Sequence, residues 1–260
     1  MRPSRILFLH GGPGLSAIAE RELYGDSLQV DWWDQPRCDV LFARPYDALL
    51  DDVAYQAERL ADLGTGKVDL LAHSFGARLA LYLAMFMPER IGAVTLVAPV
   101  FDVAAAYLRL GQRVATVGPG NSRLLQALAR FDANRDNFND FWNLVEAICE
   151  VPRFFDIYWG PNAEDQRRWF HTTIATQPWA DLNTCKVVLQ DFWTRPDLAV
   201  QTTVTGPVEL IFGSHDLLVD PSEEVRRWLN YFPHATTRRV NAGHLVHLET
   251  PPSQWMTPIA

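Results

Sequence analysis

Three residues whose side chains could together form a nucleophilic centre each follow a short apolar run: Ser74, Asp216 and His244. A serine hydroxyl is a weak nucleophile until a histidine accepts its proton, and a carboxylate keeps that histidine in the required tautomer. We therefore predict that Ser74 attacks an acyl carbon, His244 transfers the proton and Asp216 orients His244. Asp102 and Asp220 are the alternative carboxylates, but Asp220 stands directly before a predicted helix and is more typical of a helix cap.

Ser74 lies at the junction between an apolar run over 67–72 and a segment over 77–87 that is rich in helix-forming residues. A serine at such a strand-to-helix turn presents its hydroxyl above the sheet. The strand and the helix pass close together there, so small residues are needed two positions before and after the serine. This chain has Ala72 and Gly76 at those positions. Taken alone, the pentapeptide is also compatible with a serine that caps a helix.

A glycine-rich turn with the sequence HGGPG at 10–14 follows the apolar run over 6–9. The turn has no lysine and lacks the spacing of a phosphate-binding loop, which argues against a nucleotide site of that kind. Glycine lets the backbone approach a substrate closely, so the N–H groups of Gly12 and Phe75 are the predicted oxyanion hole. The alternative is a plain turn between a strand and a helix.

The elements that must position these residues alternate along the chain. Apolar runs predict strands, and helical patterns follow several of them, including one over 47–63 and one over 221–229. The predicted strands cover 6–9, 28–33, 67–72, 91–98, 208–212 and 236–240. This alternation is typical of an α/β protein with a mostly parallel sheet flanked by helices. Catalytic groups gather at the carboxyl ends of the strands in such sheets, so Ser74, Asp216 and His244 are predicted to meet there.

The alternation stops over 101–205, where several helices and many aromatic residues are predicted. We expect residues 1–100 and 206–260 to form the α/β core and the intervening residues to form an inserted helical cap, or lid. Large aromatic side chains in such a segment either fill a separate helical core or line an apolar substrate pocket. On the second interpretation, Trp142 and Trp159 contact the substrate.

In the core, Gly11 and His73 are also predicted to contact the substrate. His10, His73 and His215 are expected to be hydrogen-bonding neighbours that shape the site, whereas His247 lies on the following helix and is expected to be structural. No pair of histidines has the spacing of metal ligands on one predicted element. We therefore expect neither a metal nor a cofactor.

The composition is that of a globular protein, with 48% hydrophobic and 21% charged residues. The formal net charge of −8, without a basic stripe, argues against a general affinity for nucleic acid or anionic membranes, so a small-molecule substrate is the expected partner. Cys38, Cys149 and Cys185 are far apart and are expected to be free thiols. The apolar runs are too short for a signal peptide or a membrane span, which predicts a cytoplasmic protein. The oligomeric state stays open.

These motifs resemble those of the α/β-hydrolase superfamily, in which the nucleophile, the acid and the histidine follow the same order along the chain. Within that superfamily the chain is similar to the proline iminopeptidases. HGGPG at 10–14 matches their motif, and Asp34-Gln35 stands where they carry D-Q-R-G. The resemblance covers the chain outside 101–205. It implies an α/β-hydrolase fold with a lid, and a serine hydrolase that cleaves a small ester, lactone or amide through an acyl-enzyme.

Three features differ from the iminopeptidase pattern. The sequence PRCD at 36–39 replaces R-G-x-G, the elbow begins with Ala72, and no tryptophan–glutamate pair for the substrate's amine is found in the predicted lid. Glu146, Glu150 and Glu164 are carboxylates that could replace that pair, although solvated positions are more typical of glutamate. The alternative functions are a lyase or acyltransferase that uses the same three residues, or a non-catalytic binding protein of this fold.

Overall fold

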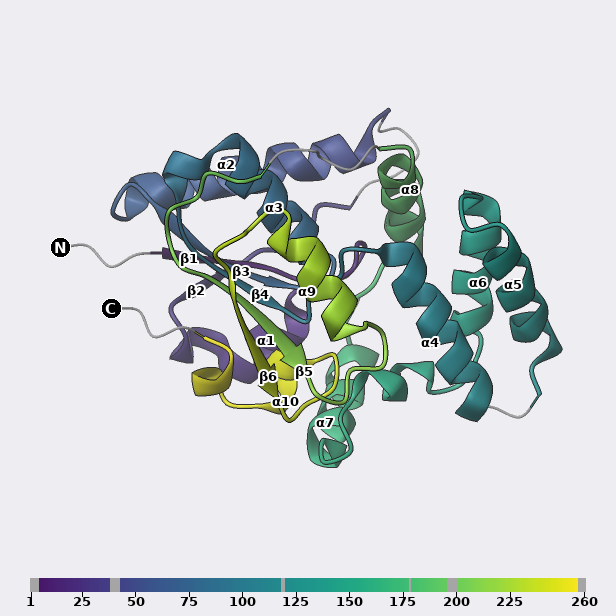
Figure 1. Ribbon diagram of the computed structural model, residues 1–260. Coiled ribbons are helices and arrows are strands. Elements are labelled where there is room, and N and C mark those ends of the chain that lie inside the picture. Colours follow the sequence, from purple (N-terminus) through teal and green to yellow (C-terminus); the bar gives the residue numbers. More distant parts are fainter. Residues whose placement is uncertain (1–4, 38–42, 118–119, 178, 196–200, 257–260) are drawn as a thin grey trace.

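The computed structural model describes residues 5–37, 43–117, 120–177, 179–195 and 201–256 (Figure 1). Its centre is a six-stranded sheet in the order β2-β1-β3-β4-β5-β6, and every neighbouring pair is parallel. The strands are β1 (Arg5–Leu9), β2 (Val30–Trp32), β3 (Val68–His73), β4 (Ile91–Val97), β5 (Val208–Gly213) and β6 (Thr236–Val240). The predicted α/β class with a mostly parallel, helix-flanked sheet is confirmed.

Alternate side chains of β1 pack on opposite faces of the sheet, as the pleat of a strand requires. Leu7 and Leu9 belong to a large hydrophobic cluster with α2 (Pro45–Leu63), α3 (Gly76–Phe86) and α9 (Pro221–Leu229). Ile6 and Phe8 belong to a smaller cluster with α1 (Ile18–Tyr24) and the C-terminal segment around α10 (Val246–Glu249). Both faces are therefore covered, which explains why this strand is a continuous apolar run. These five helices surround the sheet, together with the 3₁₀ turns η1 (Gly25–Ser27), η2 (Pro88–Arg90) and η4 (Pro252–Gln254).

A helical segment separates β4 from β5 and falls within the range 101–205. Its elements are α4 (Val103–Val117), α5 (Ser122–Ala133), α6 (Phe138–Cys149), η3 (Phe154–Tyr158), α7 (Glu164–Ala175) and α8 (Leu182–Trp193). Side chains of Asn121, Asn137 and Asp181 accept backbone N–H groups at the starts of α5, α6 and α8, which explains where these helices begin. Figure 1 shows α4, α5 and α6 grouped at one end of the sheet. We call this segment the cap.

Aromatic side chains form much of the interior of the cap. The rings of Phe131 and Phe141 are fully buried between α5 and α6, with centroids 5.6 Å apart. A second cluster places Trp159 against Phe170 with centroids 5.4 Å apart. Large rings bury the area that short helices need in order to pack.

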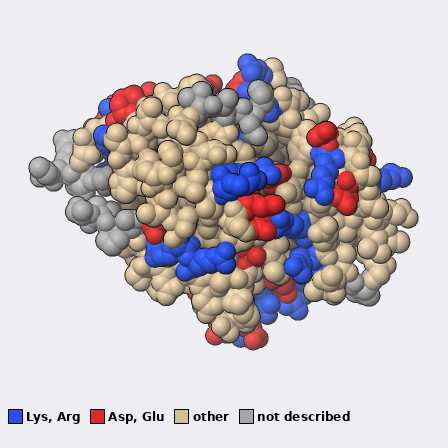
Figure 2. Space-filling model, viewed as in Figure 1, with Lys and Arg blue, Asp and Glu red and all other residues tan. Residues whose placement is uncertain are grey.

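Charged side chains of both signs are interleaved on the face seen in Figure 2. Ion pairs link the cap to the core at α9, because Arg109 of α4 lies 3.2 Å from Glu223. Arg227 of α9 lies 3.0 Å from Asp102, which directly precedes α4. Exposed pairs of this kind contribute about 0–1 kcal/mol each. They add little to the stability that apolar packing provides.

The sequence predicts that the chain has no membrane span and that its cysteines are free thiols. Within the described part of the chain, no helix combines the length and the apolar character needed to cross a bilayer. Cys149 and Cys185 are free thiols. Cys38 lies outside the described residues.

Candidate active site

Ser74 occupies a sharp turn between β3 and α3 with a φ of 54°. A left-handed backbone is unfavourable for a residue that carries a Cβ, so the surrounding contacts must hold it. The Ser74 N–H donates to the carbonyl of Val97 at 3.0 Å. A Cβ added to Gly76 would lie 2.2 Å from the carbonyl oxygen of Leu9, which explains the glycine there. At the position on the other side of the turn, the methyl group of Ala72 is fully buried.

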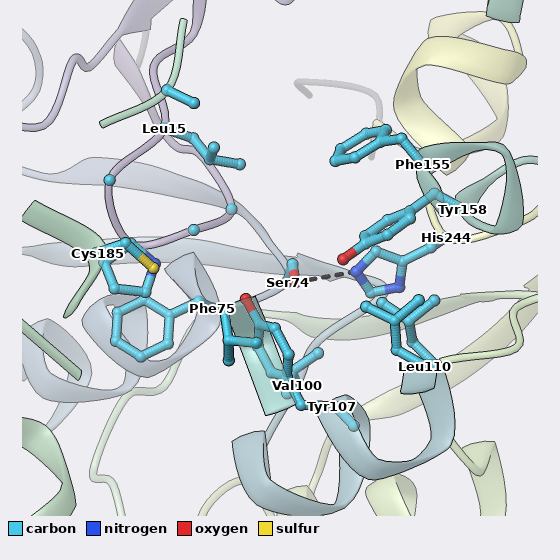
Figure 3. A pocket seen from close by; sticks show the side chains of 18 of the residues that line it. Leu15, Ser74, Phe75, Val100, Tyr107, Leu110, Phe155, Tyr158, Cys185 and His244 are labelled. Atoms are coloured by element: carbon cyan, nitrogen blue, oxygen red, sulfur yellow. Dashed lines mark hydrogen bonds between the residues drawn. The ribbon is translucent and has the colours of Figure 1, made fainter. Parts of the chain in front are cut away.

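Ser74, His244 and Asp216 lie in one hydrogen-bonded line just after the carboxyl ends of β3, β6 and β5. His244 Nε2 is 2.9 Å from Ser74 Oγ, the contact drawn in Figure 3, and His244 Nδ1 is 2.7 Å from Asp216 Oδ2. An ionised carboxylate can only accept hydrogen bonds, so Asp216 holds the proton of the His244 ring on Nδ1. Nε2 is then free to accept a hydrogen bond from the Ser74 hydroxyl. His244 and Asp216 are both buried, and the other Asp216 oxygen accepts the Leu218 N–H at 2.9 Å.

The two alternative carboxylates have other partners. Asp102 lies 3.0 Å from Arg227 and accepts the N–H of Ala105. Asp220 accepts the N–H of Ser222 at 2.9 Å and caps α9, and its hydrogen bonds with Ser222 hold its pKa below the usual range. Of the three carboxylates, the structure brings only Asp216 to His244.

The HGGPG turn passes directly over Ser74. A Cβ added to Gly11 would lie 3.2 Å from Ser74 Cβ and 3.0 Å from His73 Nδ1. Gly12 has a φ of 129°, which glycine alone adopts readily. Among the described residues, neither the Gly12 N–H nor the Phe75 N–H has a hydrogen-bond acceptor. Both amides are therefore available to bind an oxyanion at the elbow.

Gln35 of the Asp34-Gln35 dipeptide holds this turn in place. The Gly14 N–H donates to Gln35 Oε1 at 3.0 Å, and the Gln35 N–H donates to His10 Nε2 at 3.1 Å. The second bond places the proton of His10 on Nδ1, which donates to the carbonyl of Gly11 at 2.5 Å. Burial lowers the pKa of His10, and its ring stacks on Trp33 with centroids 5.0 Å apart. His10 therefore shapes the loop as a neutral ring.

His73 supports the backbone of His244. Its Nε2 donates to the carbonyl of His244 at 3.0 Å, and its ring centroid lies 4.3 Å from that of His247. Burial and the nearby His247 hold the pKa of His73 well below its usual value. His247 Nε2 lies 2.8 Å from the buried carboxylate of Glu20, which gives His247 a structural position. His215 is exposed and lies outside the described lining of the cavity.

Glu249 ties the loop that carries His244 to the cap. Its carboxylate accepts the N–H of Gly243 at 2.9 Å and the N–H of Gly160 at 3.0 Å. The His244 N–H donates to the carbonyl of Tyr158 at 2.7 Å. A Cβ added to Gly243 would lie 2.4 Å from that carbonyl, so glycine permits the contact. Burial raises the pKa of Glu249, and sequence reasoning did not identify this residue.

A cavity of about 160 Å³ lies above Ser74, between the core and the cap (Figure 3). The cap contributes one face each of α4 and α6, at positions spaced three and four residues apart. These positions are Val103, Ala106, Tyr107 and Leu110 on α4, and Val145, Ile148 and Cys149 on α6. Gly11 and His73, the two core residues predicted to contact the substrate, also line the cavity. Pockets for drug-sized ligands measure about 300–1,000 Å³, so this cavity suits a compact group.

Trp142 and Trp159 differ from expectation, because neither is among the described residues that line this cavity. Trp142 lies one turn before Val145 on α6, and its indole N–H donates to Glu146 at 2.7 Å. Trp159 is buried against Phe170. Both indoles stabilise the cap, as in the alternative interpretation of its aromatic residues.

The three carboxylates considered for an amine site lie in ion pairs on the cap surface. Glu146 and Glu150 both contact Arg123, the former at 3.5 Å. Glu164 lies 3.3 Å from Arg168. All three are absent from the described lining of the cavity.

Asp181 is the one carboxylate among the described lining residues. Its Oδ1 accepts the N–H groups of Asn183 and Thr184 at 3.0 and 3.1 Å, so it serves as the cap of α8. Elsewhere in the described chain, no group of three or more histidine, cysteine, aspartate or glutamate side chains is arranged to hold a metal ion.

Solved structures of other proteins share this architecture. A proline iminopeptidase-related protein from Thermus thermophilus is 25% identical, with 96% of this chain and 86% of that chain covered and a TM-score of 0.66. A thermophilic esterase from Thermogutta terrifontis is 20% identical, with 97% and 86% covered and a TM-score of 0.60. A mutant epoxide hydrolase from Bacillus megaterium is 16% identical, with 97% and 90% covered and a TM-score of 0.57.

No curated protein matches the chain by sequence. Residues 5–251, however, match the protein family described as the alpha/beta hydrolase fold. The match spans nearly the whole chain, and the parallel sheet and the position of its helices agree with it. The chain therefore belongs to the alpha/beta hydrolase fold family.

Proposed function

We propose that this protein is a serine hydrolase that cleaves a compact, uncharged ester or lactone through an acyl-enzyme. The observation that carries the proposal is the line of hydrogen bonds from Ser74 through His244 to Asp216, which ends at the floor of an apolar cavity. A nucleophile, a base and an orienting carboxylate in this order are the parts that acyl transfer requires.

Acylation begins when a substrate carbonyl lies next to Ser74 Oγ. His244 Nε2 accepts the hydroxyl proton as the oxygen attacks, and the Asp216 carboxylate stabilises the resulting imidazolium. The N–H groups of Gly12 and Phe75 bind the developing oxyanion, and one such donor is typically worth about 3 kcal/mol of the barrier. His244 then returns the proton to the departing alkoxide, which leaves the acyl group on Ser74.

Deacylation repeats these steps with water as the nucleophile. His244, which is neutral again after the first step, accepts a proton from water as the water attacks the acyl carbon. The tetrahedral intermediate collapses, the acid departs, and the proton returns to Ser74. The same two half-reactions with an alcohol or a thiol in place of water would give an acyltransferase, which is the alternative use of this triad.

Esters and lactones are favoured over N-terminal prolyl amides because the described lining of the cavity has no carboxylate that is free to pair with an amine. Asp181 is the only carboxylate in the described lining, and both of its oxygens accept hydrogen bonds at the start of α8. A buried ammonium without a carboxylate partner costs several kcal/mol. The sequence HGGPG, typical of iminopeptidases, is interpreted here as part of the scaffold.

The test compares hydrolysis of p-nitrophenyl butyrate with that of prolyl p-nitroanilide. We expect turnover of the ester by the wild-type protein and its loss in folded Ser74→Ala, with little release from the anilide. Serine-dependent release from the anilide at a comparable rate would contradict the preference for uncharged esters. No serine-dependent turnover of either compound would favour a non-catalytic binding protein.

A further inference from the structure

Two phenol groups of the cap line the cavity above Ser74. Tyr107 comes from α4 and Tyr158 from η3, and Figure 3 shows the Tyr158 hydroxyl directed toward Ser74 and the Tyr107 hydroxyl beside Phe75. Among the described residues, neither oxygen takes part in a hydrogen bond. Both side chains are half-buried and line an apolar cavity, so a substrate that displaces water from them must supply a hydrogen-bond partner or leave them unpaired, at a cost in free energy. The two phenols are therefore positioned for a partner on a bound molecule.

The Tyr158 side chain is fixed relative to the triad. Its main-chain carbonyl accepts the N–H of His244 at 2.7 Å, and its ring meets the His244 ring edge to face with centroids 5.5 Å apart. On its other side the ring stacks on Phe155 at 4.3 Å with an interplanar angle of 4°. A ring held in this way presents its hydroxyl at a set position, so a contact made through it discriminates between ligands.

The Tyr107 ring is held by the cap interior, where it meets Phe141 edge to face at 5.2 Å. Burial raises the pKa of Tyr107 and of Tyr158 well above the usual value for tyrosine. Both groups therefore keep their protons in the ordinary pH range and can donate a hydrogen bond. An acceptor oxygen on a substrate is the group that they suit.

The rest of the described lining limits what that substrate can be. The walls are mostly apolar, and the only carboxylate in this lining, that of Asp181, already caps α8. The Cys149 and Cys185 thiols stay neutral, because burial raises the pKa of each. An ionised acyl group would find no charged partner here, whereas a purely hydrocarbon acyl group would leave two hydroxyls unpaired.

From this juxtaposition we infer that Tyr107 and Tyr158 select substrates whose acyl group is short, uncharged and substituted with an acceptor oxygen, such as an alkoxyacyl or oxoacyl group. The inference rests on the proposed serine hydrolase function and names the substrate class of that same cavity. The two tyrosines are specificity-determining residues that contact the acyl group, while Ser74 and His244 carry out the chemistry.

The experiment uses two esters whose acyl groups differ by one atom, p-nitrophenyl methoxyacetate and p-nitrophenyl butyrate, in which an ether oxygen replaces a methylene. The ratio of their kcat/KM values is measured for the wild type, Tyr158→Phe, Tyr107→Phe and the double variant. The difference in intrinsic reactivity between the esters cancels when ratios are compared across variants. Tyr82→Phe, on α3 and outside the described lining, is the matched control.

We expect the ratio of kcat/KM for the methoxyacetate to kcat/KM for the butyrate to fall about three- to tenfold in Tyr158→Phe, the change that corresponds to losing one hydrogen bond to an uncharged acceptor. The ratio should fall at least as far in the double variant. The ratio in Tyr82→Phe should equal that of the wild type. If Tyr158→Phe does not fold, Tyr107→Phe alone must lower the ratio.

Two results would overturn the inference while leaving the proposed function intact. One is a ratio that is unchanged in both tyrosine variants. The other is an equal slowing of both esters, which would make the phenols general contributors to the reaction. Absence of Ser74-dependent turnover of both esters by the wild type would contradict the proposed function and, with it, the substrate class.

Discussion

The main-chain N–H of His244 donates to the main-chain carbonyl of Tyr158 across 2.7 Å, so the loop that carries His244 is bonded directly to the cap. The Glu249 carboxylate adds a second link, because it accepts N–H groups from Gly243 of that loop and Gly160 of the cap. Any displacement of this part of the cap would therefore move the imidazole relative to Ser74. The cap therefore contributes to the position of His244 as well as to the cavity.

Replacing Glu249 by glutamine tests this link. A glutamine side chain has one acceptor oxygen and an NH₂ group, so at least one backbone N–H loses its charge-assisted bond, worth about 1.5–3 kcal/mol. We expect Glu249→Gln to lower the free energy of unfolding by about 2 kcal/mol and kcat by about tenfold, measured by denaturant titration and steady-state kinetics. Glu209→Gln, whose side chain pairs with Arg238, is the control. Unchanged kcat in a destabilised Glu249→Gln would show a purely structural link.

Asp216 is expected to act by holding the proton on His244 Nδ1. Asp216→Asn keeps the shape but presents an NH₂ group that favours the other tautomer, and a change of this kind typically lowers kcat about 10⁴-fold. Asp220→Asn is the matched control, since asparagine caps a helix as well as aspartate does. Equal losses of kcat in the two variants, or near wild-type kcat in Asp216→Asn, would contradict the assignment of Asp216 as the residue that orients His244.

Glu224 predicts a dependence of stability on pH. Burial raises its pKa to about 7 from an ordinary value of 4.5, although it accepts hydrogen bonds from the Phe101 N–H and the Trp228 indole. Between these two values the folded protein binds more protons than the unfolded chain, so the free energy of unfolding falls as pH rises and levels off above about 7.

Glu224→Gln removes this titration and keeps an acceptor oxygen for both donors. The difference in the free energy of unfolding between the variant and the wild type should shift in favour of the variant by about 2–3 kcal/mol as pH rises from 4 to 8. Denaturant titration at each pH measures it. Glu223→Gln changes the exposed neighbouring residue and should show no such gain. A constant difference between Glu224→Gln and the wild type across this range would argue against a raised pKa.

Gly76 should not tolerate a side chain. A Cβ there would lie 2.2 Å from the carbonyl oxygen of Leu9 and 2.6 Å from that of His10, and backbone atoms cannot move aside cheaply. We expect Gly76→Ala to cost about 3 kcal/mol in stability, visible as a lower denaturation midpoint. Wild-type stability in this variant would mean that β1 and α3 are farther apart than described.

Much of the core could be predicted because its signals are local. The apolar run over 6–9 indicates a buried strand, and β1 covers Arg5–Leu9. The helix predicted over 221–229 is α9 within the same bounds, since Asp220 and Pro221 define its start. Ser74, Asp216 and His244 each follow a predicted strand, and parallel strands bring their carboxyl ends to one edge.

The cap could not be predicted to the same extent, because packing between helices decides which side chains reach the cavity. Trp142 and Val145 lie on one face of α6, yet only Val145 lines the cavity. The spacing of Val103, Tyr107 and Leu110 is a signal that could have identified the α4 face. The bond between Gln35 and His10 joins residues that are distant in sequence, and only the folded chain reveals it.

Covalent labelling by a fluorophosphonate, read by intact mass and peptide mapping, tests whether Ser74 is an activated nucleophile. An activated serine displaces fluoride, so we expect one adduct per chain, located on Ser74. The adduct should be absent in Ser74→Ala and form far more slowly in His244→Ala. A folded wild-type protein that is not labelled, or that is labelled elsewhere while Ser74 stays unmodified, would contradict the assignment of Ser74 as the nucleophile.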